Sequence, residues 1–570
     1  MLFYFWSDSK TKSNMKKILF AFLAFCLITQ SFGQKNPKAI KVTYQRSYNG
    51  KLVENPDPLL LYASKDLSLT TTDKILQQKA ELPYEQTFID FNTKTISQWA
   101  QLKNKSILTN DTEALGKQKF EFSNETKKIL NYVCKKATTS VNSNKIEIWY
   151  TNDLGLKGGP AALGQDLGLV LETIRNGNSV VTASKIEILK TVPYVLKIPA
   201  VQTVDQLTYK DLLWKSRFIN IPVFNKEEIH FISDAKSNDS ILRFASGTVI
   251  VRKVKFPEIK KGSAIFADVT QQSNGDAYDR TGSVFMIPMD KKTSFLDGLK
   301  NGANTLPVYE NGNGKKYQGV AATNDYTPLL ELMRFFTPFG VKHFNYLQLK
   351  NKVWQDSVFY RQDISLLQPK LSNQEIYIGM FIGNYDAGGH KASLNISIHE
   401  GEDNNTKADY ILPLFNTLNV MEMAGQEYGT MFDNEKGIEL SFEVPEGYKN
   451  FKLSYTTTGH GGWENGDEFL QKKNTIYIDG KEVFGFTPWR TDCGSYRLSN
   501  PASGNFGNGL SSSDLSRSNW CPGTTTNPNL IDLGNLSPGK HTIRVSIPMG
   551  KPEGTSSSAW NVSGFLIGER

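Results

Sequence analysis

The sequence has few cysteines and histidines, and neither type is spaced as in a metal site. Four cysteines and six histidines occur among 570 residues, and the histidines lack the paired spacing that holds zinc. No Gly-x-Ser-x-Gly motif is present, which argues against a serine hydrolase. No heptad, solenoid repeat or nucleotide-binding loop stands out. We therefore expect a function that needs neither a metal nor another cofactor.

The sequence also lacks a large excess of one charge and a long apolar run. The formal net charge is +8, and basic residues are scattered among acidic ones, which argues against nucleic-acid binding. The apolar run after Met15 is too short for a stable membrane span. It follows two lysines and ends in small residues before a cut near Gly33, as in a secretory signal. Residues 1–33 thus form a signal peptide with an upstream extension, and we expect a secreted or periplasmic protein.

Cleavage of that signal would leave three cysteines. Cys493 and Cys521 flank a segment rich in Gly, Ser and Asn and are 28 positions apart. Because exported proteins keep disulfides, a bridge between these two is favoured over two free thiols. Cys134 is then expected to be buried and inert. Lipidation at Cys26 is the weaker alternative, because the apolar run continues beyond it.

The chain is too long for one ordinary domain, and its patterns indicate β-structure. Short strand-like runs separated by turn residues recur throughout. We divide the mature chain into a β-rich domain at 35–190, a connector at 191–230 with a short helix at 209–215, and two β-sandwiches at 231–400 and 401–570. The first domain resembles the GLPGLI family of small exported β-rich proteins, which implies no firm activity.

One polar cluster stands out between two predicted strands. Residues 275–282 read Gly-Asp-Ala-Tyr-Asp-Arg-Thr-Gly, and the alternating runs 263–269 and 283–288 flank them. A strand end can hold reactive groups at the mouth of a cleft. The simpler interpretation is a polar hairpin whose turn is fixed by an Asp–Arg pair. Spacing alone favours the simpler interpretation.

Five stretches, in order, resemble the bacterial peptide-N-glycosidase F family. They are Asp276-Ala-Tyr-Asp-Arg, Arg334-Phe-Phe-Thr-Pro-Phe, Asp363-Ile-Ser, Thr458-Gly-His-Gly-Gly-Trp with Asp467-Glu468 after it, and Arg517-Ser-Asn-Trp-Cys-Pro-Gly. The resemblance covers about the last 340 residues and implies an all-β fold of two adjacent eight-stranded jelly rolls. It also implies a secreted amidase that hydrolyses the amide joining an N-glycan to Asn and converts that Asn to Asp. The implied partner is an N-glycoprotein or glycopeptide, and we expect a monomer.

The resemblance also assigns candidate residues. Asp279 matches the principal carboxylate and could activate water, and Glu468 matches a second functional acid that could orient the nitrogen or supply the proton. A third family glutamate should fall near Gly379 or Met380, where no acid occurs. The residues expected to bind substrate are Tyr278, Arg280, Phe381, His460, Trp463, Arg490 and Arg517.

Several of these residues have plainer interpretations. His460 is more simply a packing residue or a loop hydrogen-bond partner, Trp463 a loop anchor, and Arg517 a solvated surface residue. Arg280 could keep Asp279 ionised or contact the sugar. At the level of the whole protein, the alternative is a non-catalytic carbohydrate-binding or adhesion protein on the same scaffold. A glycoside hydrolase that uses Asp279 and Glu468 as its acid pair is a third interpretation.

Overall fold

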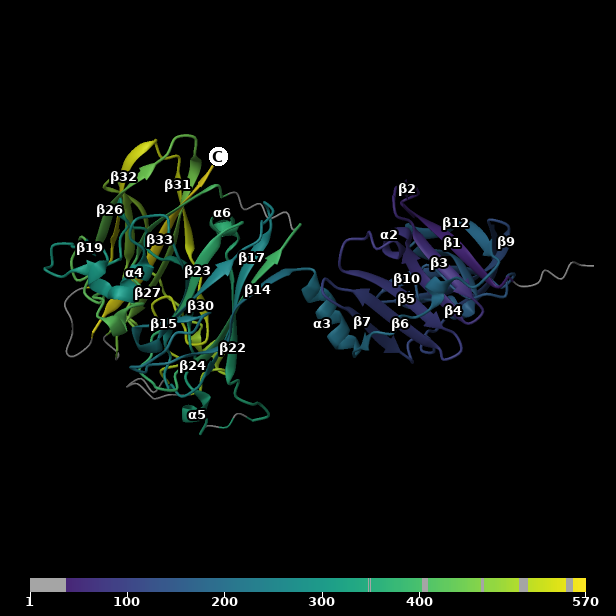
Figure 1. Cartoon of the computed structure of the whole chain (residues 1–570), viewed down its shortest axis with the longest axis horizontal. Coiled ribbons are helices and arrows are strands. Elements are labelled where there is room, and N and C mark those ends of the chain that lie inside the picture. Colours follow the sequence, from purple (N-terminus) through teal and green to yellow (C-terminus); the bar gives the residue numbers. More distant parts are fainter. Residues whose placement is uncertain are drawn as a thin grey trace, which may run out of the picture. The chain divides into compact units, whose positions relative to one another are not determined.

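The computed structural model describes residues 37–346, 348, 350–401, 408–462, 466–501, 511–549 and 557–570. The expected signal peptide lies outside these residues. The chain divides into two compact units, Met1–Arg217 and Phe218–Arg570, so the boundary falls inside the segment 191–230. Strands dominate both units, as Figure 1 shows. No helix among the described residues is long and apolar enough to cross a membrane.

The first unit is built on one large sheet. In its described part this sheet has 13 strands, in the order β13-β7-β6-β5-β4-β3-β1-β12-β11-β10-β9-β8, with β2 paired to β1. The strands are β1 (Ala39–Tyr48), β2 (Lys51–Val53), β3 (Leu59–Ser64), β4 (Leu67–Thr72), β5 (Tyr84–Asp90), β6 (Thr95–Gln101), β7 (Ser106–Asp111), β8 (Glu121–Ile129), β9 (Tyr132–Val141), β10 (Asn144–Thr151), β11 (Leu169–Arg175), β12 (Ser179–Leu189) and β13 (Gln202–Thr203).

Two helices accompany this sheet, α2 (Asp73–Leu76) and α3 (Gln206–Ser216). Helix α3 confirms the predicted short helix, and it begins after Asp205, whose carboxylate accepts a hydrogen bond of 2.9 Å from the backbone N–H of Thr208. This is an ordinary N-cap, which satisfies a donor that the first helical turn leaves free. Cys134 is fully buried in the apolar core, as expected. Burial raises the pKa of its thiol to about 11, so it stays protonated and inert.

The second unit begins with a sandwich of two antiparallel sheets. One sheet is β14-β24-β17-β22, and the other is β15-β16-β23-β18-β21-β30. Apolar side chains from both sheets share one buried core, so the sheets face each other. The strands are β14 (Ile219–Ile229), β15 (Leu242–Phe244), β16 (Val249–Lys255), β17 (Ala264–Ser273), β18 (Thr281–Ile287), β21 (Leu330–Phe336), β22 (Ser357–Asp363), β23 (Glu375–Ile382), β24 (His390–His399) and β30 (Thr525–Thr526). Eight of them form the sandwich, and the short β15 and β30 extend one sheet.

A second sandwich follows, with four strands in each sheet in the described part of the chain. The sheets are β25-β33-β27-β31 and β26-β32-β28-β29, and they enclose their own core. Their strands are β25 (Tyr410–Asn416), β26 (Ile438–Val444), β27 (Lys449–His460), β28 (Asn474–Ile478), β29 (Lys481–Phe486), β31 (Asn529–Gly534), β32 (Gly539–Ser546) and β33 (Ala559–Glu569). The remaining elements include β19 (Val308–Tyr309), β20 (Tyr317–Gln318), α4 (Phe295–Asn301), α5 (Val341–Phe344) and α6 (Gln368–Leu371). The predicted all-β fold with two sandwiches is confirmed.

A buried ion pair joins the two sandwiches. Arg334 and Glu331, both on β21, form two hydrogen bonds of 2.8 and 3.0 Å. Arg334 also donates to Thr458 Oγ1 on β27 and to the carbonyl oxygen of Asn561 on β33, at 3.1 and 2.6 Å. The hydroxyl of Ser563 on β33 donates to Glu331. Because an ion pair out of water is stable only with its remaining hydrogen bonds satisfied, this network fixes how the sandwiches meet.

The polar cluster at 275–282 is not a hairpin turn. β17 belongs to one sheet of the first sandwich and β18 to the other, and the two strands do not pair. The segment between them therefore crosses from sheet to sheet at one end of the sandwich. The hairpin interpretation is wrong, because alternation shows that a strand has one buried face but does not show which neighbour it pairs with.

Candidate active site

Asp279 and Glu468 meet at one arginine. The Nη1 atom of Arg517 lies 3.2 Å from Asp279 Oδ2 and also donates a hydrogen bond to Glu468 Oε1. Asp279 comes from the crossing segment of the first sandwich, and Glu468 comes from the turn that follows β27 in the second. The two carboxyl side chains keep about 15% and 16% of their surface exposed, whereas Arg517 keeps 1%. The arginine therefore brings acids from two sandwiches to a single place.

The position of Arg517 is fixed by its backbone and by its ring neighbours. Its backbone exchanges hydrogen bonds of 2.8 and 3.0 Å with that of Arg490. Its guanidinium carbon lies 4.4 Å from the ring centre of Trp520 and 5.1 Å from that of Phe469. The adjacent disulfide between Cys493 and Cys521 closes the segment, which confirms the predicted pairing. Arg517 is thus a buried, oriented cation and not a surface residue.

The same segment also holds the turn that carries Glu468. The backbone N–H of Ser518 donates to the carbonyl oxygen of Glu468 at 2.9 Å, and the Ser518 hydroxyl donates to that of Asp467 at 2.6 Å. The neighbouring Asp467 is 2% exposed and accepts a hydrogen bond of 2.7 Å from the indole N–H of Trp560. Asp467 therefore anchors the turn, and Glu468 is the acid that faces Arg517.

Asp279 has the properties of a reactive carboxylate. Burial raises its pKa, and the guanidinium groups of Arg517 and Arg280 act in the opposite direction. Its Oδ2 atom is buried, and its 3.2 Å contact with Arg517 Nη1 does not have the geometry of a hydrogen bond. Such atoms are rare in folded proteins and point to a role in binding or catalysis. A poorly solvated carboxylate whose hydrogen-bonding capacity is not filled is a suitable general base.

Arg280 pairs with a different acid than expected. It makes two hydrogen bonds to Asp276, of 2.6 and 3.0 Å, and His390 Nε2 lies 3.2 Å from the same carboxylate. Burial opposes ionisation of Asp276, but the hydrogen bonds from His390 and Arg280 hold its pKa well below its usual range. Asp276 therefore stabilises the crossing segment, and the expectation that an Asp–Arg pair fixes this segment holds for Asp276 and not for Asp279.

Two exposed tyrosines flank Arg280 beside Asp279. The guanidinium carbon of Arg280 lies 5.4 Å from the ring centre of Tyr278 and 5.6 Å from that of Tyr385. Each tyrosine is 56% exposed. The Tyr385 hydroxyl donates to Glu422 at 2.7 Å, and burial together with Glu422 raises the pKa of Tyr385 to about 12. Sequence analysis missed Tyr385 and Glu422, because neither lies in a recognisable motif. Exposed aromatic rings next to a polar site suit a sugar ligand.

Unlike these two tyrosines, Phe381 and His460 pack among other side chains. Phe381 is 1% exposed and lies in an apolar cluster. The expectation that it lines the site is therefore wrong, because its side chain is buried in the cluster on the face of β23 that points away from the core between the two sheets. His460 stacks on Phe336 and Trp520. Burial and nearby arginines lower its pKa to about 3, so it stays neutral and serves in packing.

The missing third acid has a packing explanation. Gly379 lies on β23 opposite Phe285, and any side chain at this position would collide with the Phe285 ring. Met380, the next residue, is fully buried. An acid is therefore excluded at Gly379 by packing and would be buried at position 380. No group of three or more potential metal ligands occurs among the described residues, and Trp463 lies outside them.

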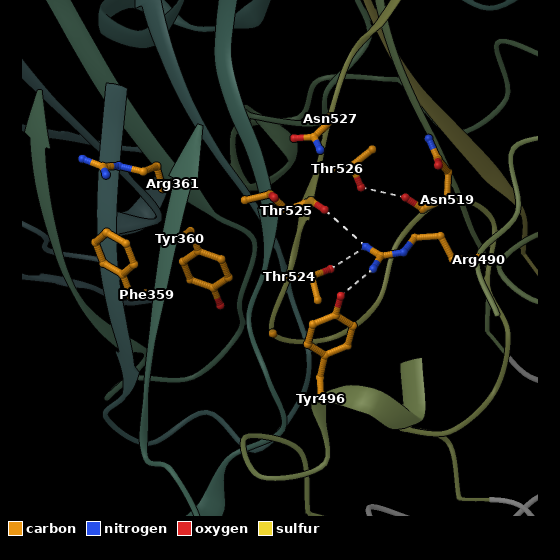
Figure 2. A pocket seen from close by; sticks show the side chains of 11 residues that line it. Phe359, Tyr360, Arg361, Arg490, Tyr496, Asn519, Thr524, Thr525, Thr526 and Asn527 are labelled. Carbon is orange, nitrogen blue, oxygen red and sulfur yellow. Dashed lines mark hydrogen bonds between the residues drawn. The ribbon is translucent and has the colours of Figure 1, made fainter. Parts of the chain in front are cut away.

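Arg490 lines a separate pocket. Its side chain donates to Asp492 at 2.9 and 2.7 Å, to the Thr524 hydroxyl at 2.9 Å and to the Tyr496 hydroxyl at 3.0 Å. Figure 2 shows the contacts of Arg490 with Thr524 and Tyr496 in a pocket of about 420 Å³, with residues 359–361 of β22 on the opposite wall. Neither Asp279 nor Glu468 lines this pocket. Arg490 is therefore linked to the two acids through its backbone hydrogen bonds with Arg517.

Comparison with known proteins identifies the family. Residues 220–398 match the model "Peptide-N-glycosidase F, N terminal", residues 427–567 match "Peptide-N-glycosidase F, C terminal", and residues 42–211 match "N-glycanase peptide, N-terminal domain". Two solved structures of PNGF-II are similar. One is 55% identical with a TM-score of 0.87 and covers 93% of this chain and 98% of its own. The other is 56% identical with a TM-score of 0.88 and covers 94% and 99%.

The search of curated proteins finds no match. The three family models and the two PNGF-II structures nevertheless agree over both units of the chain. The chain therefore belongs to the peptide-N-glycosidase F family.

Proposed function

We propose that this protein is an exported amidase that releases N-linked glycans by hydrolysing the amide between N-acetylglucosamine and asparagine. Family membership supports an N-glycanase-type function. The observation that carries the finer proposal is the contact of Arg517 with both Asp279 and Glu468, which come from different sandwiches. Export is supported by the Cys493–Cys521 disulfide, since such bonds persist in oxidising compartments.

The arrangement suits attack by water on an amide carbonyl. Asp279 accepts a proton from water as the water oxygen bonds to the side-chain carbonyl carbon of the substrate asparagine. The Arg517 guanidinium lies beside the negative charge that develops on the carbonyl oxygen and can stabilise it. When the carbon–nitrogen bond breaks, the proton held by Asp279 passes to the leaving nitrogen. The products are aspartate in the polypeptide and a glycosylamine.

Glu468 fits the role of a positioning acceptor. It accepts a hydrogen bond from Arg517 through one of its two carboxylate oxygens. An ionised carboxylate accepts hydrogen bonds only, so it can hold the amide N–H of the substrate. Of the two roles considered for Glu468, orientation of the nitrogen therefore fits better than donation of a proton.

Product analysis tests the proposal. A denatured N-glycoprotein is incubated with the wild-type protein or with Asp279→Ala, and the glycosylation-site peptide is measured by mass spectrometry. We expect a bare Asp peptide and an intact free glycan with wild type, and an unchanged glycopeptide with the variant. A peptide that retains one N-acetylglucosamine would indicate a glycoside hydrolase instead. Binding without any product would indicate a carbohydrate-binding protein.

A further inference from the structure

The first unit contains a cavity that the proposed hydrolysis does not use. Its volume is about 550 Å³, within the usual range of about 300–1,000 Å³ for ligand pockets. Strands β5 and β6 form its floor, the segment after α2 contributes one wall, and the turn η2 (Tyr194–Leu196) with the residues after it contributes another.

The floor alternates aromatic and amide side chains. Tyr84 on β5 lies opposite Gln101 on β6, and Gln86 lies opposite Trp99. Because alternate residues of a strand point to the same face, all four side chains share one face of the sheet. The rings of Tyr84 and Trp99 have centres 6.0 Å apart and are inclined by 47°. Two aromatic surfaces are thus interleaved with two amides.

The hydrogen bonding of the two amides and of one indole favours a polar ligand. Gln86 donates to the Thr71 hydroxyl at 2.9 Å, and Gln101 accepts from the Ser106 hydroxyl at 2.6 Å and donates to the carbonyl oxygen of Leu102 at 2.9 Å, so both side chains are held in place. The indole N–H of Trp99 is buried and has no hydrogen-bond partner among the described residues. A buried donor without a partner favours an acceptor from a ligand or water.

The mouth of the cavity is open and almost uncharged. Tyr194 is 83% exposed and Leu82 is 41% exposed, which is unusual for large apolar side chains. Among the described residues that line the cavity, Lys197 carries the only charge. Strands β5 and β6 each pair on both sides, so they offer no free edge to which a peptide strand could add. These features favour a neutral ligand with apolar faces and many hydroxyl groups.

We propose that this cavity binds a neutral oligosaccharide, in a site separate from Asp279 and Glu468. Sugar rings present apolar C–H faces that pack on aromatic rings, and hydroxyl groups that bond to amides. On a glycoprotein that carries several glycans, such a site would raise the local concentration of substrate without taking part in hydrolysis.

A residue-specific binding experiment tests this site on the full chain. The protein is labelled with 5-fluorotryptophan, and the Trp99 resonance in the fluorine spectrum is assigned from the Trp99→Phe variant. The probes are mannopentaose and N,N′-diacetylchitobiose, with a non-glycosylated apolar peptide for comparison. We expect a saturable shift of the Trp99 resonance with at least one sugar, and no shift with the peptide.

Two exposed tyrosines provide matched variants. Tyr194→Ala removes a ring at the cavity mouth, whereas Tyr48→Ala removes a ring that is 55% exposed elsewhere in the same unit. We expect the first to weaken sugar binding at Trp99 at least fivefold and the second to leave it unchanged. No shift at Trp99 with either sugar, a shift with the peptide alone, or equal effects of the two variants would overturn the proposal. The fluorine signal of Trp99 does not depend on catalysis, so a protein that hydrolyses no substrate can still show sugar binding.

Discussion

Replacing Arg517 by methionine tests whether this side chain organises the acid pair. Methionine keeps an unbranched apolar stem against Trp520 and Phe469 but removes the cation beside Asp279 and Glu468. Loss of one buried donor at a developing oxyanion costs about 2.7–4 kcal/mol, or about 10²–10³ in kcat. We therefore expect Arg517→Met to lower kcat on a glycopeptide by about that factor.

The pH dependence should change in a defined direction as well. The base works only when ionised, so kcat/KM falls as the pH drops through the pKa of Asp279. Burial already raises this pKa, and Arg517 counteracts the rise. Without the arginine the pKa rises further, and the acid limb of the kcat/KM profile moves to higher pH. Glycopeptide hydrolysis followed by mass spectrometry across a pH series measures both effects.

Arg490→Met is the matched control. Arg490 pairs through its backbone with Arg517, and its guanidinium binds Asp492, Tyr496 and Thr524 but neither candidate acid. We expect this variant to keep the wild-type acid limb even if its stability falls. If the two variants show the same profile, or if Arg517→Met keeps the wild-type kcat, Arg517 does not act on the acids and the reasoning is refuted.

Three further changes have defined outcomes. Asp276→Asn leaves Arg280 without its carboxylate and should lower stability by about 3 kcal/mol at pH 7. The pKa of Asp276 is lower in the fold than its ordinary value of 3.8, so the difference from wild type in thermal unfolding should shrink below that pH. A difference that stays constant with pH would contradict the pairing of an ionised Asp276 with Arg280. Cys493→Ser opens a loop of 28 residues and should cost about 3–4 kcal/mol in urea denaturation, whereas an unchanged midpoint would show that the bridge is dispensable. Tyr385→Ala removes an exposed ring beside Arg280 and should raise KM for glycopeptides with little change in kcat, and an unaltered KM would exclude sugar contact there.

The features of the fold and the site that could be predicted from the sequence depend on local patterns or on a resemblance. Short alternating runs indicated the sandwiches, a short helical run at 209–215 indicated α3, and a Gly-rich segment between Cys493 and Cys521 indicated the disulfide. Asp279 and Glu468 came from the resemblance and not from spacing, since isolated acids at strand ends are common.

The rest depends on contacts between distant parts of the chain. Arg517 contacts Asp279 where two sandwiches meet, and no local pattern in the sequence encodes that meeting. The same limit explains the wrong prediction for Phe381, because an aromatic side chain suits the wall of a ligand site as well as a buried core. Only the folded structure shows that helix α4 and residues 418–421 cover this face of β23 and bury the ring.

Hydrolysis in water enriched in oxygen-18 shows which carbon atom of the substrate the water attacks. If Asp279 directs water to the amide carbonyl carbon, the aspartate formed in the glycosylation-site peptide carries one heavy oxygen atom in its side chain, and Asp279→Asn forms no such peptide. Unlabelled aspartate, or an asparagine left intact after the glycan has gone, would show that water attacks elsewhere and would contradict the account.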